Sequence, residues 1–266
     1  MTSLLDRKQS LIPDAHLPSL VTSLGREKPR KLWQLAIEKE SRLILALDLY
    51  ETPALGDNRK LGEEKTSKLR IASLMESLRD LVVAIKIGFP LLLSVGLETL
   101  SDLMRSFNDD YYFIADFKLS DIPEVNSFVV EVLAKIGFDG AIFQVFQGGL
   151  ERTSKPMDRF ALVMMSHPEA ALCAKNFGEL IGLAKRAKVE GLVVGATKLY
   201  YVRRARSLVP HATIISPGVI TQGGEPSSAL REGADFEIVG RAIINSEEPE
   251  LVAEELVRRE RDVLRG

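Results

Sequence analysis

The 266-residue sequence contains a single cysteine, Cys173, and no Asn-x-Ser/Thr sequon. One cysteine cannot form an internal disulfide or a Cys-x-x-Cys metal or redox site. Disulfides and glycosylation sequons are features of oxidising compartments and secreted proteins, and this sequence has neither. We therefore expect a cytoplasmic protein.

Long hydrophobic runs and an excess of charge of one sign are also missing. The longest unbroken apolar run spans six residues, 160–165, whereas a membrane-spanning helix needs about 20. Asp6, Arg7 and Lys8 follow only two leucines, so we expect no signal peptide. With 35 basic and 37 acidic residues, the chain has no general basic surface for nucleic acid. Neither a membrane nor a nucleic acid is predicted as a partner.

Eight short apolar runs follow residue 40, most of them rich in β-branched residues or leucine. They are nearly continuous rather than alternating, which is typical of strands buried on both faces of a parallel sheet. The predicted strands are Leu43–Leu47, Leu81–Ile87, Tyr112–Ala115, Ala141–Val145, Phe160–Met165, Leu192–Val194, Thr213–Ile215 and Phe236–Val239.

Several intervals between these runs have helical periodicity, as in Val129, Val132, Leu133 and Ile136. Eight strands alternating with helices predict an α/β fold of the (β/α)8 TIM barrel type, formed by residues 41–266. Residues 1–40 are predicted to be an N-terminal extension, broken by prolines at first and then helical from Arg30 to Glu40.

Polar side chains follow or interrupt several of these strands near their carboxyl ends, where barrel enzymes carry their active sites. Asp48 follows the first strand and Lys86 interrupts the second. The third run leads into Asp116, Lys118 and Asp121. Ser166 follows the fifth, within Met-Ser-His-Pro.

Lys86 has apolar residues on both sides, and a lone buried ammonium group is costly. Either its chain reaches out to solvent, or it faces the barrel mouth and pairs with Asp116. Asp116 and Lys118 share a strand parity and point the same way. Together with Asp121 they form either a structural ion-pair cluster at the rim or a catalytic charge network.

The last two strands predict a phosphate site, which this fold often places in the loops after strands seven and eight. Gly218 follows Pro217, and Gly223–Gly224 allow a close backbone approach. Gln222 offers a donor, and Arg241 after Gly240 offers a bidentate guanidinium group.

Taken together, these motifs resemble orotidine 5′-phosphate decarboxylases of the archaeal type. The resemblance rests on Leu-Ala-Leu-Asp, Ile-Lys-Ile-Gly, Asp-x-Lys-x-x-Asp-Ile-Pro, Met-Ser-His-Pro, Ser-Pro-Gly-x-x-x-Gln-Gly-Gly and Val-Gly-Arg-Ala-Ile, which occur in the family's order between residue 43 and about residue 245. The family resemblance implies cofactor-free and metal-free decarboxylation of orotidine 5′-phosphate to uridine 5′-phosphate and CO2, in the synthesis of UMP.

The resemblance also implies residue roles. Lys86, Asp116, Lys118 and Asp121 match the catalytic tetrad, with Lys118 as proton donor to C6 and Asp121 reaching into a partner's site in a homodimer. The implied substrate-binding residues are Asp48 for the ribose, Lys86 and Asp116 at the reacting group, Ser166 for the pyrimidine, and Pro217, Gly218, Gln222, Gly240 and Arg241 for the phosphate. His167 is interpreted as a residue that shapes its turn.

One position departs from the family pattern. Val125 stands where these enzymes usually have threonine, so the hydrogen bond that threonine makes across the subunits is either lost or passed to Asn126 or Ser127. The segment 50–68 is also longer than the resemblance requires, and residues 1–40 match no part of the family.

Two other functions remain open from the sequence. A metal-dependent ketogulonate-phosphate decarboxylase or hexulose-phosphate synthase shares the Asp-x-Lys-x-x-Asp pattern, but typically has a metal-binding glutamate at the position of Lys86. A barrel that binds nucleotides without catalysis is the second alternative.

Overall fold

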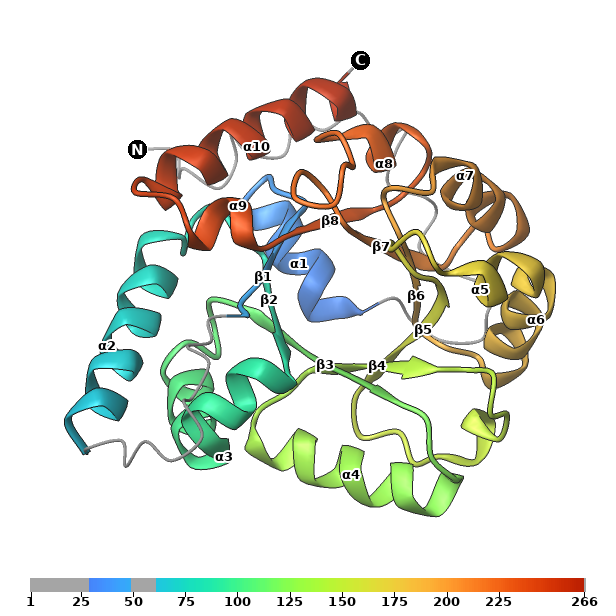
Figure 1. The fold of residues 1–266 in the computed structure, drawn as a ribbon, viewed down its shortest axis with the longest axis horizontal. Helices are drawn as coiled ribbons and strands as arrows, with labels where there is room; N and C mark the ends of the chain where they lie inside the picture. The colour runs from blue at the N-terminus through green and yellow to red at the C-terminus, as the bar shows by residue number, and fades with distance from the viewer. Residues whose placement is uncertain (1–28, 49–60, 266) are drawn as a thin grey trace, which may run out of the picture.

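Eight parallel strands form a closed barrel in the order β1 to β8, each hydrogen-bonded to the next and β8 to β1 (Figure 1). The computed structural model describes residues 29–48 and 61–265, except for the side chains of 61–67. The strands are β1 Leu43–Ala46, β2 Ala84–Gly88, β3 Tyr112–Leu119, β4 Gly140–Gln144, β5 Asp158–Met164, β6 Gly191–Val194, β7 Thr213–Pro217 and β8 Phe236–Val239. The predicted (β/α)8 fold is confirmed.

Helices surround the barrel, packed on the outward side chains of the strands (Figure 1). They are α2 Leu61–Ser77, α3 Phe89–Ser106, α4 Pro123–Ile136, α5 Ala171–Lys175, α6 Phe177–Ala187, α7 Leu199–Leu208, α8 Ser228–Arg231, α9 Arg241–Ile244 and α10 Pro249–Arg265. Between β4 and β5 the chain forms only a 3-10 turn, Leu150–Arg152, instead of a helix. The alternation expected from the sequence is therefore incomplete at that crossing.

β3 is four residues longer than predicted. The apolar run ends at Ala115, but the backbone stays in the sheet through Leu119 because the pairing with β4 resumes after a shift in register. Ala115 faces Ala141, whereas Leu119 faces Phe143. The register shift lies between Ala115 and Leu119. Asp116 and Lys118 interrupt the apolar pattern there, which is why the sequence predicts that the strand ends at Ala115.

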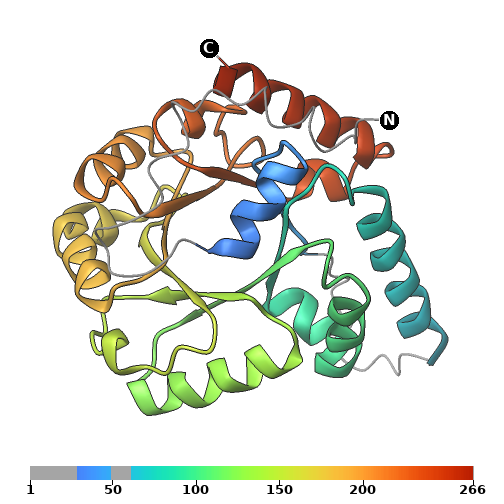
Figure 2. The ribbon, with the colours of Figure 1, turned by 180° about the vertical axis from the view of Figure 1, so that it is seen from behind.

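Helix α1 (Arg30–Glu38) closes the amino-terminal end of the barrel (Figure 2). Its buried side chains, among them Leu32 and Leu35, pack against inward residues of the strands. Trp33 Nε1 donates to Thr213 Oγ1 at the start of β7, and Lys39 Nζ donates to the carbonyl of Val82 just before β2. The predicted helix is thus present, and it seals the end of the barrel opposite the carboxyl ends of the strands.

Among the described residues, every helix is too short or too polar to cross a lipid bilayer.

Candidate active site

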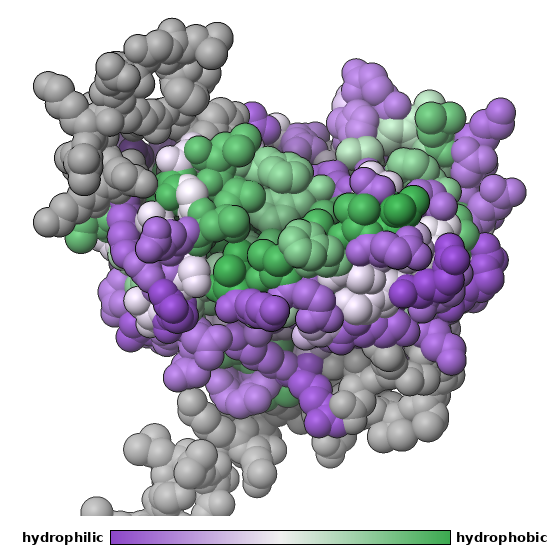
Figure 3. Space-filling model, turned by 90° about the horizontal axis from the view of Figure 1, so that it is seen from below, coloured by the Kyte–Doolittle hydropathy of each residue, from purple (hydrophilic) through white to green (hydrophobic). Residues whose placement is uncertain are grey.

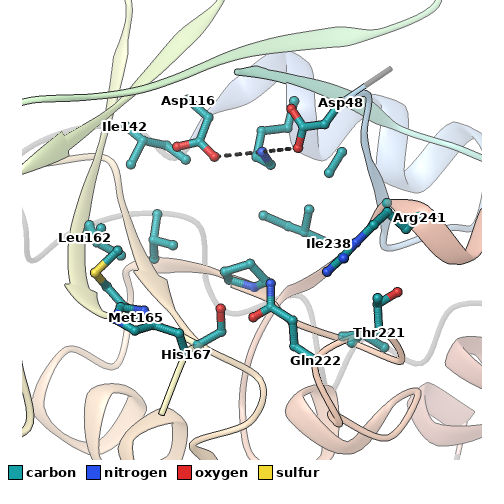
Figure 4. A pocket seen from close by; sticks show the side chains of 18 of the residues that line it. Asp48, Asp116, Ile142, Leu162, Met165, His167, Thr221, Gln222, Ile238 and Arg241 are labelled. Atoms are coloured by element: carbon teal, nitrogen blue, oxygen red, sulfur yellow. Dashed lines mark hydrogen bonds and ion pairs between the residues drawn. The ribbon is translucent and has the colours of Figure 1, made fainter. Parts of the chain in front are cut away.

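A cavity of about 460 Å³ opens at the carboxyl ends of the strands (Figure 4). Nearly all the site residues predicted from the sequence line it. These are Asp48, Lys86, Asp116, Lys118, Ser166, Pro217, Gly218, Gln222, Gly240 and Arg241. Asp121 is the exception.

The strand register explains how Lys86 meets two carboxylates. Lys86 lies level with Ala46 of β1 on one side and Ile114 of β3 on the other. Asp48 comes two residues after Ala46, and Asp116 comes two residues after Ile114. Both aspartates therefore lie on the same face as Lys86 and closer to the barrel mouth. The Lys86 side chain extends towards the mouth and reaches both.

The Nζ atom of Lys86 lies 2.7 Å from Asp116 Oδ2 and 3.7 Å from Asp48 Oδ2. Burial opposes the ammonium charge, but the carboxylates of Asp116 and Asp48 outweigh burial and raise the pKa of Lys86 above its usual value. Burial also opposes the Asp116 carboxylate, yet Lys86 and Lys118 hold its pKa below the usual value. Lys86 and Asp116 are therefore both charged at neutral pH.

Lys118 completes the array from the irregular part of β3. Its Nζ donates to Asp116 Oδ1 at 2.7 Å, so Asp116 receives one lysine on each carboxylate oxygen. Lys118 has a backbone φ of +45°, in the left-handed region that side chains other than glycine rarely adopt. Its side chain is 41% exposed, against 8% for Lys86. Both lysines line the cavity, and Lys118 is the more accessible of the two.

Asp121 is exposed and does not line the cavity of its own chain. Its carboxylate accepts a hydrogen bond from the backbone N–H of Ile122, and its backbone is held by Asn126. Asn126 is buried and uses both ends of its amide on Asp121. Ser127 donates to the carbonyl of Pro123 and accepts from the N–H of Ser154. Asn126 Nδ2 and the hydroxyl of Ser127 thus each donate one hydrogen bond within their own chain.

The opposite side of the cavity carries the groups predicted to hold phosphate. In Figure 4 the side chains of Gln222 and Arg241 point into the cavity across from Asp48 and Asp116. Gly218 has φ +102°, and a methyl group there would lie 2.8 Å from Cβ of Ser166. The guanidinium group of Arg241 forms no ion pair with any residue that the structure describes, and it lines the cavity.

Sequence reasoning missed several residues of the cavity wall. The inward strand residues Ile142, Leu162, Val193 and Ile238 form an apolar part of the lining. Alternate residues of these strands point inward, so strand parity identifies them once the register is known. His167, for which the sequence predicts a role in shaping the turn, also lines the cavity beside Ser166. Thr221 lies next to Gln222 (Figure 4).

The family model named orotidine 5′-phosphate decarboxylase / HUMPS family matches residues 41–256. The chain belongs to this family. The orotidine 5′-phosphate decarboxylase of Methanosarcina mazei is 37% identical over 239 residues, which cover 86% of this chain and 100% of that protein. The resemblance drawn from the sequence motifs is thereby confirmed.

Solved structures agree with this membership. The orotidine 5′-monophosphate decarboxylase of Metallosphaera sedula is 34% identical and superposes with a TM-score of 0.69 over 84% of this chain and 99% of that one. The enzyme of Methanocaldococcus jannaschii, crystallised with the inhibitor BMP, is 28% identical with a TM-score of 0.68, over 85% of this chain and 99% of that one.

Proposed function

We infer that the chain is an orotidine 5′-phosphate decarboxylase, which converts orotidine 5′-phosphate to uridine 5′-phosphate and CO2 in pyrimidine biosynthesis. The observation that carries this inference is the array of Asp48, Lys86, Asp116 and Lys118 on three adjacent strands, facing Arg241 across one cavity. An array of two lysines and two aspartates at one side of a cavity and a guanidinium group at the other suit a substrate with a reacting group at one end and a phosphate at the other.

The array suits a reaction that develops negative charge at one carbon. When the bond between C6 and the carboxylate breaks, its electron pair stays at C6 in an orbital outside the ring's π system. A fixed ammonium beside C6 stabilises that charge more than it stabilises the substrate. We assign this role to Lys118, whose Nζ proton then moves to C6, and water restores the proton.

Lys86 and Asp116 position the reacting group. Asp116 takes a hydrogen bond from each lysine, which aims Lys118 at the cavity. A substrate carboxylate placed beside the charged Asp116 is repelled, and the loss of CO2 relieves that repulsion. Asp48, on the far side of Lys86, is assigned to the ribose hydroxyl groups.

The remaining lining residues hold the two ends of the nucleotide. We assign Ser166 to the pyrimidine, and Gln222 with Arg241 to the phosphate. A guanidinium group binds phosphate well because it donates charge-assisted hydrogen bonds. Pro217, Gly218 and Gly240 bring the backbone close to the phosphate.

A spectrophotometric assay tests the function directly. Purified protein mixed with orotidine 5′-phosphate is expected to show the absorbance loss of decarboxylation, equally with and without EDTA. Loss of activity in EDTA would favour the metal-dependent sugar-phosphate enzymes of the same family. Binding of the nucleotide without turnover would favour a non-catalytic barrel.

The position of Lys86 argues against the metal-dependent alternative. Its ammonium lies between Asp48 and Asp116, at 3.7 Å and 2.7 Å, so these two carboxylates already share a cation. A divalent ion placed there would be repelled by Lys86 and would have to displace it.

We also propose that the active protein is a homodimer formed through α3 and α4. Exposed apolar side chains gather there, as the green band of Figure 3 shows. Leu93 is 81% exposed on α3 and Phe128 is 71% exposed on α4. Phe89, Leu97, Ile122 and Val125 are exposed on the same two helices and at the start of α4. An apolar area of this kind marks an interaction site.

A second copy is the occupant that best explains this surface. Asp121, which the family resemblance places in the catalytic tetrad, is exposed beside Ile122 and outside its own cavity. A dimer through α3 and α4 would carry Asp121 towards the partner's cavity. We place the enzyme in the cytoplasm, because its single cysteine carries a free thiol.

A further inference from the structure

The loop after β6, residues 195–197, lies outside the cavity lining but contacts two segments that form it. Gly195 N donates to Met164 O at 2.9 Å. Thr197 Oγ1 donates to the carbonyl of Ser166 at 2.5 Å. Ala196 N donates to Pro217 O at 2.8 Å. The loop therefore ties the end of β5 to the end of β7, the two neighbours of β6 in the barrel (Figure 1).

Close packing supports the same three-way contact. A methyl group on Gly195 would lie 2.6 Å from Cα of Ser166, a distance that no side chain can occupy. On the other side, a methyl group on Gly224 would meet the side chain of Ala196 at 3.3 Å. The loop thus lies directly against both the Ser166 segment and the loop that carries Gln222.

We propose that residues 195–197 form a bracket that sets the spacing between the two substrate-binding segments, with Thr197 as a positioning residue for substrate binding. This inference rests on the proposed function, in which Ser166 meets the pyrimidine and the loop 217–222 meets the phosphate. A nucleotide has a fixed length between those groups, so both contacts form together only when the segments are held at that spacing.

Thr197 acts through Ser166 and not on the substrate. Ser166 lies two residues beyond Met164, the last residue of β5, and outside regular secondary structure. Its carbonyl accepts a hydrogen bond from the hydroxyl of Thr197, in the loop after the neighbouring strand β6. This bond restrains the backbone around Ser166. Removing the hydroxyl takes this partner from the carbonyl and loosens the backbone that presents the Ser166 side chain.

Thr197→Val and Thr197→Ser test the bracket. Thr197→Val is expected to raise KM for orotidine 5′-phosphate, and Kd for the product UMP, by about threefold to tenfold, since one net hydrogen bond is lost. The kcat should change by less than about threefold, because the array around Asp116 is untouched. Thr197→Ser keeps the hydroxyl and should restore both constants.

The control is Thr213→Val, the same change at a buried threonine whose hydroxyl accepts from Trp33 at the other end of the barrel. It should lower Tm without altering KM. Equal KM values for wild type and Thr197→Val, or equal losses in Thr197→Val and Thr197→Ser, would overturn the bracket.

A double-mutant cycle with Ser166→Ala separates a bracket from general loosening. If Thr197 acts through Ser166, Thr197→Val should alter KM by less than about twofold in the Ser166→Ala background. Additive losses would overturn the proposal. UMP binding separates it from the proposed function. If the wild-type protein does not decarboxylate orotidine 5′-phosphate but Thr197→Val still weakens UMP binding, the proposed decarboxylase function is wrong and the proposed role of residues 195–197 stands.

Discussion

Lys118 donates to Asp116 from a backbone conformation that lysine rarely adopts, with φ +45° and 2.7 Å between Nζ and Oδ1. The two residues lie in the part of β3 where the pairing with β4 shifts. Such a backbone costs about 1–3 kcal/mol and persists where the surrounding contacts enforce it. The irregular strand therefore places the ammonium group at the cavity at some cost in stability.

Replacing Lys118 should separate catalysis from folding. Lys118→Ala and Lys118→Gly both lack the proton donor and should show no measurable decarboxylation. Glycine tolerates positive φ, so Lys118→Gly should be more stable than Lys118→Ala by about 1 kcal/mol in urea unfolding. Activity within tenfold of wild type in either variant would remove Lys118 from its role. A control at the exposed helical site, Lys185→Ala, should keep full activity.

Subunit mixing tests whether Asp121 serves the partner's site. Lys118→Ala and Asp121→Ala are each expected to be inactive alone. After dissociation and reassociation, a heterodimer would have one site with both lesions and one with neither. Random pairing then restores about a quarter of wild-type activity. Verified heterodimers without any recovered activity would place Asp121 in the site of its own chain.

Arg241→Ala should affect the phosphate and little else. One or two charge-assisted hydrogen bonds, each worth about 1.5–3 kcal/mol, would be lost, so kcat/KM for orotidine 5′-phosphate should fall by about 10-fold to 1000-fold. Turnover of the nucleoside orotidine, which has no phosphate, should scarcely change. Added phosphite should activate wild type towards orotidine much more than the mutant. Equal losses on both substrates would instead indicate a structural role for Arg241.

Leu32→Ala tests whether α1 is part of the barrel core. Leu32 is fully buried against the inward residues at the amino-terminal end of the barrel. Its truncation should lower the free energy of unfolding by about 2–5 kcal/mol. Ile37→Ala, on the same helix but 44% exposed, is the matched control and should cost much less. Similar losses in the two variants in urea unfolding would show that α1 does not anchor in the core.

Glu260 on α10 should make stability depend on pH. Burial raises the pKa of Glu260 from 4.5 to about 8 in the folded chain. Between these values the folded protein binds one proton more than the unfolded one, so the free energy of unfolding decreases as pH rises. Glu260→Gln removes this dependence while keeping an oxygen acceptor for the N–H of Arg42.

The stability of Glu260→Gln relative to wild type should therefore increase by up to about 1.4 kcal/mol per pH unit between pH 4.5 and 8. Urea unfolding across this range measures the difference. Glu254→Gln, at an exposed position of the same helix, should track wild type throughout. A constant difference between Glu260→Gln and wild type would show that Glu260 is ionised in the folded state.

The barrel and most of the residues of its cavity can be predicted from local patterns in the amino-acid sequence. Nearly continuous apolar runs report burial on both faces, and this signal is local, so the eight strands could be found without knowing their neighbours. The polar residues that end or interrupt these runs, such as Asp48 and Lys86, mark the mouth for the same reason. The length of β3 could not be found in this way, because Asp116 and Lys118 break the apolar pattern while the backbone remains paired.

Which side chains contact one another depends on the folded arrangement of the strands and loops. That Lys86 lies between Asp48 and Asp116 depends on the register of three strands. That Asp121 stays outside its own cavity depends on the path of the loop after β3. The place of α1 in the barrel end and the bond from Thr197 to Ser166 join segments far apart in the chain. Such contacts have no local periodicity to reveal them, because they are set by the closure of the barrel as a whole.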